Sequence, residues 1–182
     1  MNTDRRLEIE VKVRVVSLPL CREKLLGLGA EALYPRALER NLVFDAPGGE
    51  LKRQGILLRL RRAGRQTLLT MKAPEGRASA YKVREETETD VSDFSAMEKI
   101  LRGIGYQTVF TYEKYRETFR LGGVLIMLDE TPIGDFLEIE GDPPAIDDAA
   151  ARLGFSGADY ITDSYHRLFI LSGRSGDMVF AP

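Results

Sequence analysis

The chain has 182 residues, of which 43% are hydrophobic and 30% charged, a composition that predicts one folded globular domain rather than a disordered chain. Its 26 basic and 28 acidic residues leave a net charge of -2, which argues against nucleic acid as a partner because nucleic-acid binders usually carry a clear basic excess. The single Cys21 excludes an intrachain disulfide. No apolar run approaches the roughly 18 residues of a membrane span, and the segment MNTDRRLEIE lacks the apolar part of a signal peptide. We therefore expect a cytoplasmic protein without a membrane partner.

Eight strands are predicted in chain order, because apolar and polar residues alternate with a period of two along each of them. They cover residues 5–16, 37–45, 56–64, 65–74, 81–91, 107–121, 124–130 and 134–141. Residues 75–79 are expected to form a loop. A single domain is expected over residues 1–172, followed by a frayed tail at residues 173–182.

Helices are predicted between some of these strands. The first follows the first strand, with Ser17 as N-cap and Gly29 as C-cap. The second follows the fifth strand and begins at Ser92, with apolar residues at helical spacing up to Gly105. Two more helices follow the last strand, at residues 143–154 and 159–173.

The polar face of the strands carries charges rather than neutral groups. In the first strand, the segment LEIEVKV places Glu8, Glu10 and Lys12 on one face and aliphatic residues on the other. The same phase is repeated along later strands by Arg59, Arg61, Lys72, Lys82, Arg84, Glu86, Glu88, Asp90, Lys114, Arg116, Asp129, Glu138 and Glu140. An ordinary half-exposed sheet would explain one or two such strands by contact with solvent, whereas seven in one small domain predict a shared charged interior.

These patterns together predict an α+β fold: a closed antiparallel eight-stranded β barrel, or tunnel, with a charged lumen and helices packed outside. Closure would remove the exposed sheet edges. The polarity is then inverted relative to a small lipid-binding barrel, and aliphatic residues such as Leu58, Leu60, Ile126 and Leu128 would face outward and need covering by the helices.

Some ionisable residues have simpler explanations. Lys82, Asp90 and Arg120 share the lumenal phase but lie towards strand ends, where solvent exposure explains them equally well. His166 lies among apolar residues of the last predicted helix, which favours a packing or surface role over a ligand. Three glutamates are out of phase with the charged face and are expected to point away from the lumen: Glu85, Glu113 and Glu117.

The order of the charged residues resembles that of the CYTH superfamily, also called triphosphate tunnel metalloenzymes. The resemblance begins at EIEVK, residues 8–12, and spans roughly residues 7–141, while YITDSYHRLFIL is similar to the end of the class IV adenylate cyclase branch. It implies a tunnel that binds an inorganic or organic triphosphate together with Mg²⁺ or Mn²⁺. Known activities of the superfamily are adenylate cyclase, thiamine triphosphatase, inorganic tripolyphosphatase and RNA triphosphatase, and dimers occur among the similar cyclases, so a homodimer is possible.

The chemistry of a triphosphate and a hard cation suits these residue types. Guanidinium and ammonium groups neutralise phosphates, which predicts a triphosphate-binding set of Lys12, Arg59, Arg61, Lys72, Arg84, Lys114 and Arg116. Magnesium prefers oxygen ligands, which predicts a metal-binding set of Glu8, Glu10, Glu86, Glu88, Asp129, Glu138 and Glu140, with Glu10 and Glu138 as first choices. The catalytic residues are predicted to be Glu8, Glu10, Lys12, Asp129 and Glu138.

The function predicted from these observations is a metal-dependent enzyme similar to class IV adenylate cyclase, which converts ATP to cyclic AMP and pyrophosphate. An inorganic tripolyphosphatase or a thiamine or nucleoside triphosphatase could use the same residues. A non-catalytic module that binds triphosphate or polyphosphate is a further alternative. The sequence contains neither GxxxxGK[ST] nor GxGxxG, which disfavours P-loop and dinucleotide-binding folds.

Overall fold

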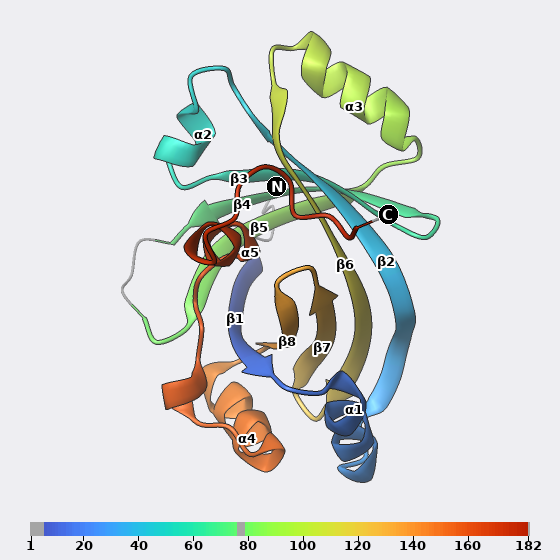
Figure 1. Ribbon diagram of the computed structural model, residues 1–182, viewed down its shortest axis with the longest axis vertical. Helices are drawn as coiled ribbons and strands as arrows, with labels where there is room; N and C mark the ends of the chain where they lie inside the picture. The colour runs from blue at the N-terminus through green and yellow to red at the C-terminus, as the bar shows by residue number, and fades with distance from the viewer. Residues whose placement is uncertain (1–5, 76–78, 182) are drawn as a thin grey trace.

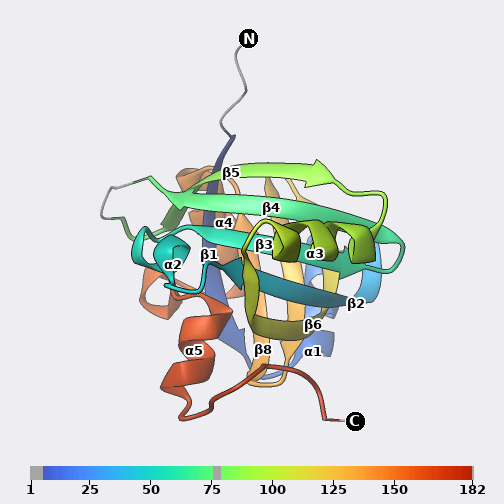
Figure 2. The same ribbon diagram turned by 90° about the horizontal axis from the view of Figure 1, so that it is seen from above.

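The computed structural model describes residues 6–75 and 79–181, and most of the loop predicted at residues 75–79 lies outside them. Its strands form a closed antiparallel barrel in the order β1-β5-β4-β3-β2-β6-β7-β8, which confirms the predicted fold class (Figure 1). The strands are β1 (Arg6–Val15), β2 (Glu31–Asp45), β3 (Leu57–Ala63), β4 (Gln66–Pro74), β5 (Lys82–Asp90), β6 (Gln107–Leu121), β7 (Val124–Thr131) and β8 (Gly134–Glu140). In the view from above, β3 and β4 run across β7 and β8, which lie on the opposite side of the barrel (Figure 2).

Helices lie outside the barrel wall or at its ends. They are α1 (Leu18–Gly27), α2 (Glu50–Arg53), α3 (Phe94–Gly103), α4 (Pro143–Leu153) and α5 (Tyr165–Leu171), together with a short 3₁₀ helix, η1 (Gly157–Asp159). Ser17 caps α1 as predicted, since its hydroxyl accepts from the Leu20 amide at 3.4 Å. The cap of α3 is Asp93, one residue after the predicted Ser92, and its carboxylate accepts from the Ala96 amide at 2.9 Å.

Strand β2 is longer than the sequence predicts, because it begins at Glu31 rather than at residue 37. Its pairing with β6 shifts register between Ala32 and Ala37, around Pro35. Proline lacks the amide hydrogen that a sheet ladder requires, so an irregular register accommodates it where a regular strand would not. The period-two pattern is interrupted at the same place, which is why the prediction missed the first part of the strand.

The C-terminal segment differs most from the expectation. The predicted helix at residues 159–173 is confined to α5, and Ile161 instead pairs with Lys12 of β1 through two backbone hydrogen bonds of 3.0 and 2.8 Å. This pairing is possible because β5 covers only residues 6–10 of β1, so that the edge beyond them is open. The backbone at Ile161 is therefore held by pairing with a strand that is distant in sequence, and not by a helix.

The tail was predicted to be frayed, but around Met178 it packs against β6. Met178 is fully buried and forms a parallel bridge with Tyr112 of β6. The Asp177 carboxylate accepts from the Thr111 amide at 2.7 Å. Strand β7 pairs with β6 only from Tyr115 onward, so the earlier part of β6 has an open edge that the tail fills.

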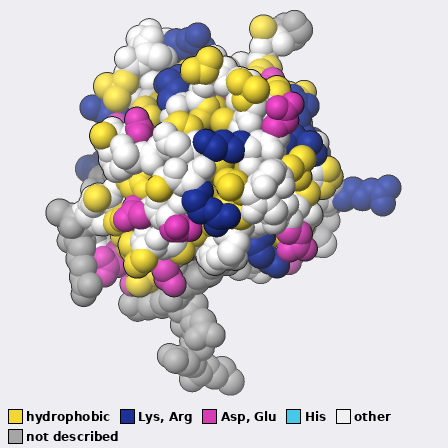
Figure 3. All heavy atoms as spheres, turned by 90° about the horizontal axis from the view of Figure 1, so that it is seen from below, with side chains coloured by type: hydrophobic (Ala, Val, Ile, Leu, Met, Phe, Trp, Pro, Cys, Tyr) yellow, Lys and Arg dark blue, Asp and Glu magenta, His cyan; other side chains and the backbone are white. Residues whose placement is uncertain are grey.

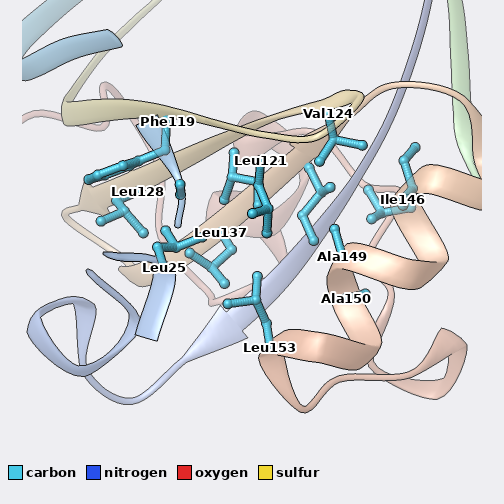
Figure 4. Packing of buried hydrophobic residues seen from close by; sticks show 14 residues of the cluster. Leu25, Phe119, Leu121, Val124, Leu128, Leu137, Ile146, Ala149, Ala150 and Leu153 are labelled. Atoms are coloured by element: carbon cyan, nitrogen blue, oxygen red, sulfur yellow. The ribbon is translucent and has the colours of Figure 1, made fainter. Parts of the chain in front are cut away.

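The apolar core lies on the outer face of the barrel, as the inverted polarity predicts. One cluster joins α1 and α4 to β1, β6, β7 and β8, and Figure 4 shows Ile146, Ala149 and Leu153 of α4 facing the sheet. A second cluster packs α3 against β2 and β3 through Leu101, and includes Leu60. A third, at the end of the lumen, packs α5 and the tail against aromatic side chains of β6 and β8.

The molecular surface is mixed in character. On the face shown in Figure 3, apolar, basic and acidic side chains of the described residues are interspersed. Within residues 6–75 and 79–181, no helix is long and apolar enough to cross a membrane. The homodimer stays a prediction.

Candidate functional site

The barrel lumen contains a cavity of about 670 Å³. It is lined by ionisable side chains from seven of the strands, because alternate residues of each strand point inward. Strand register sets their partners: Glu10 stands opposite Lys82 of β5 and Glu140 of β8, and Lys12 stands opposite Glu138. The register therefore places opposite charges together in two of these pairs, Glu10 with Lys82 and Lys12 with Glu138, and like charges in the third.

The centre of the site is a chain of charges around Lys12, whose side chain is 2% exposed. The Lys12 ammonium donates to Glu10 at 2.9 Å and lies 3.2 Å from Glu138, while the Lys82 ammonium donates to the same Glu10 oxygen at 2.6 Å. Burial alone would raise the pKa of Glu10, but Lys12 and Lys82 outweigh it and hold that pKa far below its usual value. Glu10 is therefore ionised, and Lys12 stays charged because Glu10 and Glu138 raise its pKa against the opposing effect of burial.

A second group of contacts surrounds Asp129, which is fully buried. Arg116 donates to both of its oxygens at 2.6 Å, Lys114 donates at 3.0 Å, and the Tyr165 hydroxyl donates at 2.6 Å. Arg116 also donates to Glu138, which links this group to the centre. Burial, reinforced by the carboxylate of Asp129, raises the pKa of Tyr165 well above its usual value, so its hydroxyl remains a donor.

Lys72 connects two carboxylates on neighbouring strands. Its ammonium donates to Glu8 Oε1 and lies 3.0 Å from Glu86 Oε2. Burial raises the pKa of Glu8 to about 7; Lys72 opposes this rise, whereas the negative charges of Glu10 and Glu86 add to it. Glu8 is thus a carboxyl group that can hold or release a proton near neutral pH.

The arginines of β3 form the opposite wall. Arg59 donates to the Tyr112 hydroxyl at 3.2 Å and to Thr70 at 3.3 Å, and Thr70 in turn donates to Glu88 at 2.7 Å. Arg61 lies 3.4 Å from Glu88. These contacts hold both guanidinium planes along the cavity.

Glu39 of β2 also lines the cavity and lies between Arg61, at 3.5 Å, and Lys114, at 3.7 Å. Burial alone would raise its pKa, but Lys114, Arg116 and Arg61 together lower it to about 2. Glu39 is therefore a permanent anion that fixes cations on two strands.

Several buried polar atoms of the site lack a hydrogen-bond partner among the described residues. They are the Nε donors of Arg59, Arg61 and Arg84 and the oxygens Glu8 Oε2 and Glu39 Oε2. Such atoms are uncommon in folded proteins because leaving one unpaired costs about 1–3 kcal/mol. Unpaired donors beside an unpaired carboxylate oxygen are what a site for an anion and a cation would leave when only the protein is present.

The charges of the lumen balance. Within the described ranges, nine basic side chains lie in or beside the cavity with nine acidic ones. The basic residues are Lys12, Lys52, Arg59, Arg61, Lys72, Lys82, Arg84, Lys114 and Arg116, and the acidic residues are Glu8, Glu10, Glu39, Asp45, Glu86, Glu88, Asp129, Glu138 and Glu140. An incoming polyanion would therefore leave a negative excess, which a bound cation could offset.

The structure brings the predicted site residues together around one cavity, with two qualifications. Asp129 lies behind Arg116 and does not line the cavity, and Arg84 donates to the backbone carbonyls of Gly55 and Lys72 while still lining it. Among the described residues, no three His, Cys, Asp or Glu side chains are placed so that they could hold a metal ion by themselves. Asp90, at the end of β5, is exposed.

Sequence reasoning missed four participants: Lys82, Glu39, Tyr112 and Tyr165. The Lys82 side chain has the lumenal phase, but exposure to solvent explained its charge equally well. How deeply it is buried depends on the pairing of β5 with β1. Glu39 alternates with Leu38 in β2, a signal that could have been read. The two tyrosines have no signal in the sequence, because their hydroxyl contacts come from strand register and from the position of α5.

Comparison with known proteins agrees with this geometry. A family model for the CYTH domain matches residues 6–165. A curated protein of Methanocaldococcus jannaschii named "putative adenylate cyclase" is 25% identical over 135 residues, which cover 74% of this chain and 76% of the relative.

Three solved structures share the fold. One named a "putative adenylate cyclase" from Vibrio parahaemolyticus is 24% identical with a TM-score of 0.79, covering 92% of this chain and 98% of its own. A protein of Pyrococcus horikoshii is 26% identical with a TM-score of 0.74, covering 88% and 98%. A Hippeastrum protein, described as an adenylyl cyclase candidate with a dominant triphosphatase activity, is 22% identical with a TM-score of 0.67, covering 92% and 97%. Since the family model covers most of its length, the chain belongs to the CYTH family.

Proposed function

We propose that the protein is a metal-dependent enzyme that acts on a triphosphate, and that its reaction is the conversion of ATP to cyclic AMP and pyrophosphate. The observation that carries the proposal is the lumen itself, where buried guanidinium donors without partners stand beside buried carboxylates. The names of the Methanocaldococcus and Vibrio relatives favour the cyclase.

The basic side chains would bind the triphosphate. Arg59 and Arg61 both line the cavity, and each has a buried Nε donor without a hydrogen-bond partner among the described residues. A guanidinium fork can contact two phosphate oxygens at once. Lys72, Lys114 and Arg116 line the same cavity and would supply further charge. Their existing contacts with carboxylates hold them in place, so little side-chain freedom is lost on binding.

The carboxylates fit a divalent cation, and Mg²⁺ or Mn²⁺ is proposed. Magnesium in proteins is usually bound by one or two carboxylates together with substrate phosphates, which suits a site without three clustered carboxylates. Glu10 and Glu138 would hold it, with Glu140 opposite Glu10 and the free Glu8 Oε2 nearby. When bound, the ion would offset the negative charge of the phosphates and polarise their oxygens.

Glu8 is proposed to move the proton in the cyclase reaction. The ribose 3′ oxygen would form a bond to the α-phosphorus while the bond from that phosphorus to the bridging oxygen breaks, and pyrophosphate would leave with the electron pair. The proton of the 3′ hydroxyl would pass to Glu8 Oε2, which has no other partner among the described residues. A pKa of about 7 is suited to a general base at neutral pH.

Asp129 is proposed to act by orienting Arg116 and Lys114 rather than by touching the substrate. Among the described residues, the hydrogen bonds to its carboxylate come from these two cations and from Tyr165, and it is fully buried. Its role would be to hold the two cations against the cavity when phosphates compete for them.

A triphosphatase is the second candidate, and the activity stated for the Hippeastrum structure favours it. In that reaction a water molecule would attack the terminal phosphorus, its proton would pass to a carboxylate, and the bond to the bridging oxygen would break. The same cations and carboxylates would serve.

Product analysis tests the proposal. The purified protein is incubated with Mg²⁺ or Mn²⁺ and with ATP or tripolyphosphate, and the products are separated by chromatography. Cyclic AMP with pyrophosphate supports the cyclase, release of phosphate supports a triphosphatase, and binding without turnover supports a non-catalytic module. Glu10→Ala should abolish turnover, whereas Glu117→Ala, on the outer face beside Arg22, should not. Absence of binding to either ligand would refute the tunnel as a triphosphate site.

A further inference from the structure

The end of the cavity between α2 and α5 differs from its charged middle. Figures 1 and 2 show these two helices on the same side of the barrel. The cavity is lined there by apolar and aromatic side chains, namely Val43, Ile56, Leu57, Val109, Phe110 and His166. An inorganic triphosphate has no apolar group that could contact such a lining, whereas pockets for organic ligands are mostly apolar with a few polar groups.

Aromatic rings connect this end to the charged wall. The Tyr112 hydroxyl accepts from Arg59 at 3.2 Å, and the Tyr112 ring stacks on Phe110 with centroids 5.7 Å apart and planes at 24°. Phe110 in turn lies 4.3 Å from the imidazole of His166. A ligand with its phosphates at Arg59 would therefore find flat rings at the next position along the cavity.

His166 is one of a few polar residues that line the cavity near α2 and α5, together with Asp45, Lys52 and Ser164. Burial, together with the positive charge of Lys52, lowers its pKa, so the ring is neutral at pH 7. A neutral imidazole has one donor and one acceptor nitrogen. Neither makes a hydrogen bond to any residue within 6–75 and 79–181, and the side chain lines the cavity, so both nitrogens can serve a ligand.

The opposite end of the cavity lacks this arrangement. It is lined by Tyr34, Pro35, Leu125 and Met127, and the Tyr34 side chain is 67% exposed. Tyr34 and Val43 are nine residues apart on β2, which places the two ends roughly 30 Å apart at the rise of a strand. The two ends can therefore be tested separately.

Resting on the function proposed above, we infer that the substrate is an organic triphosphate whose flat heteroaromatic group lies between α2 and α5, where His166 determines specificity and Phe110 supports it. Inorganic tripolyphosphate would fill only the charged middle. Stacking on an aromatic side chain strengthens the binding of a base by about tenfold or more.

The test compares analogues of ATP and of tripolyphosphate in which methylene groups replace both bridging oxygens, so that neither proposed reaction can cleave them, by calorimetry in the presence of Mg²⁺. Wild-type protein should bind the ATP analogue at least about tenfold more tightly. His166→Ala should lose this preference and keep its affinity for the tripolyphosphate analogue, which also shows that the variant is folded. Arg167→Ala, an exposed neighbour on α5, and Tyr34→Ala, at the other end, should retain the preference.

Three results would overturn the inference while leaving the triphosphate site intact: equal affinity of the wild type for both analogues, a preference that survives His166→Ala, or a preference lost in Tyr34→Ala. Failure of both analogues to bind the wild-type protein would instead refute the proposed function on which the inference rests.

Discussion

Replacing Glu138 with glutamine separates the proposed role of this residue from its contribution to folding. Lys12 would still have Glu10 at 2.9 Å, and Arg116 would still have Asp129 at 2.6 Å, so neither cation is left alone. Removing one partner of an isolated buried ion pair costs about 3–5 kcal/mol, and because both cations keep a partner we expect about 1–2 kcal/mol here.

The effect on activity should be much larger. Changing a residue that only holds a metal ligand in place already lowers metal affinity or activity by about 10–100-fold, so loss of a direct ligand should lower it by more than about 100-fold. The assay is a Mg²⁺ titration of product formation, with stability measured by urea unfolding. Glu117→Gln is the matched control, since Glu117 lies outside the barrel beside the half-exposed Arg22. A Glu138→Gln protein with wild-type rate and wild-type half-saturation by Mg²⁺ would refute the metal assignment.

Three further predictions concern other parts of the lumen. The pKa of Glu39 is about 2 in the folded protein against 4.5 in the unfolded chain, so the stability that its charge contributes is complete above pH 4.5 and is lost as the pH falls towards 2. The Glu39→Gln protein should therefore be less stable than wild type by up to about 3 kcal/mol at pH 7. The urea midpoints of the two proteins should converge in acid. Because the pKa of Glu8 is about 7, kcat/KM should rise with pH around neutrality, and a rise that persists unchanged in Glu8→Gln would exclude Glu8 as the base. Arg59→Lys should bind tripolyphosphate about tenfold more weakly, since lysine cannot replace the free Nε donor, and equal affinity in calorimetry would contradict that contact; Arg40→Lys, on the outer face, is its control.

The charged lumen could be predicted from sequence because strand phase is a local property. Glu8, Glu10 and Lys12 alternate strictly with aliphatic residues, and the same alternation recurs along the later strands. Inward and outward faces then follow without knowledge of which strands pair. Ile126 and Leu128 were assigned to the outer face on this ground, and both are buried under α1 and α4.

Features that depend on the open edges of strands could not be predicted. Ile161 and Met178 lie in segments with helical or disordered character in the sequence, yet each pairs with a strand edge that its neighbours leave uncovered. The contact of Tyr165 with Asp129 follows from that placement of the C-terminal segment. These are consequences of how far β5 and β7 extend along their partners, which no local pattern encodes.

The inverted polarity of the barrel separates its stability from its chemistry. Each strand places its packing residues on one face and its charges on the other, so Ile139 belongs to the outer core and its neighbours Glu138 and Glu140 to the lumen. Truncation of the fully buried Ile139 to alanine should cost about 2–5 kcal/mol without moving a charged group. Changes in the lumen remove charges that are expensive to bury and contribute little to the core. The protein can therefore keep a cavity crowded with ionised groups, because most of the apolar packing that holds the strands in place lies on their other side.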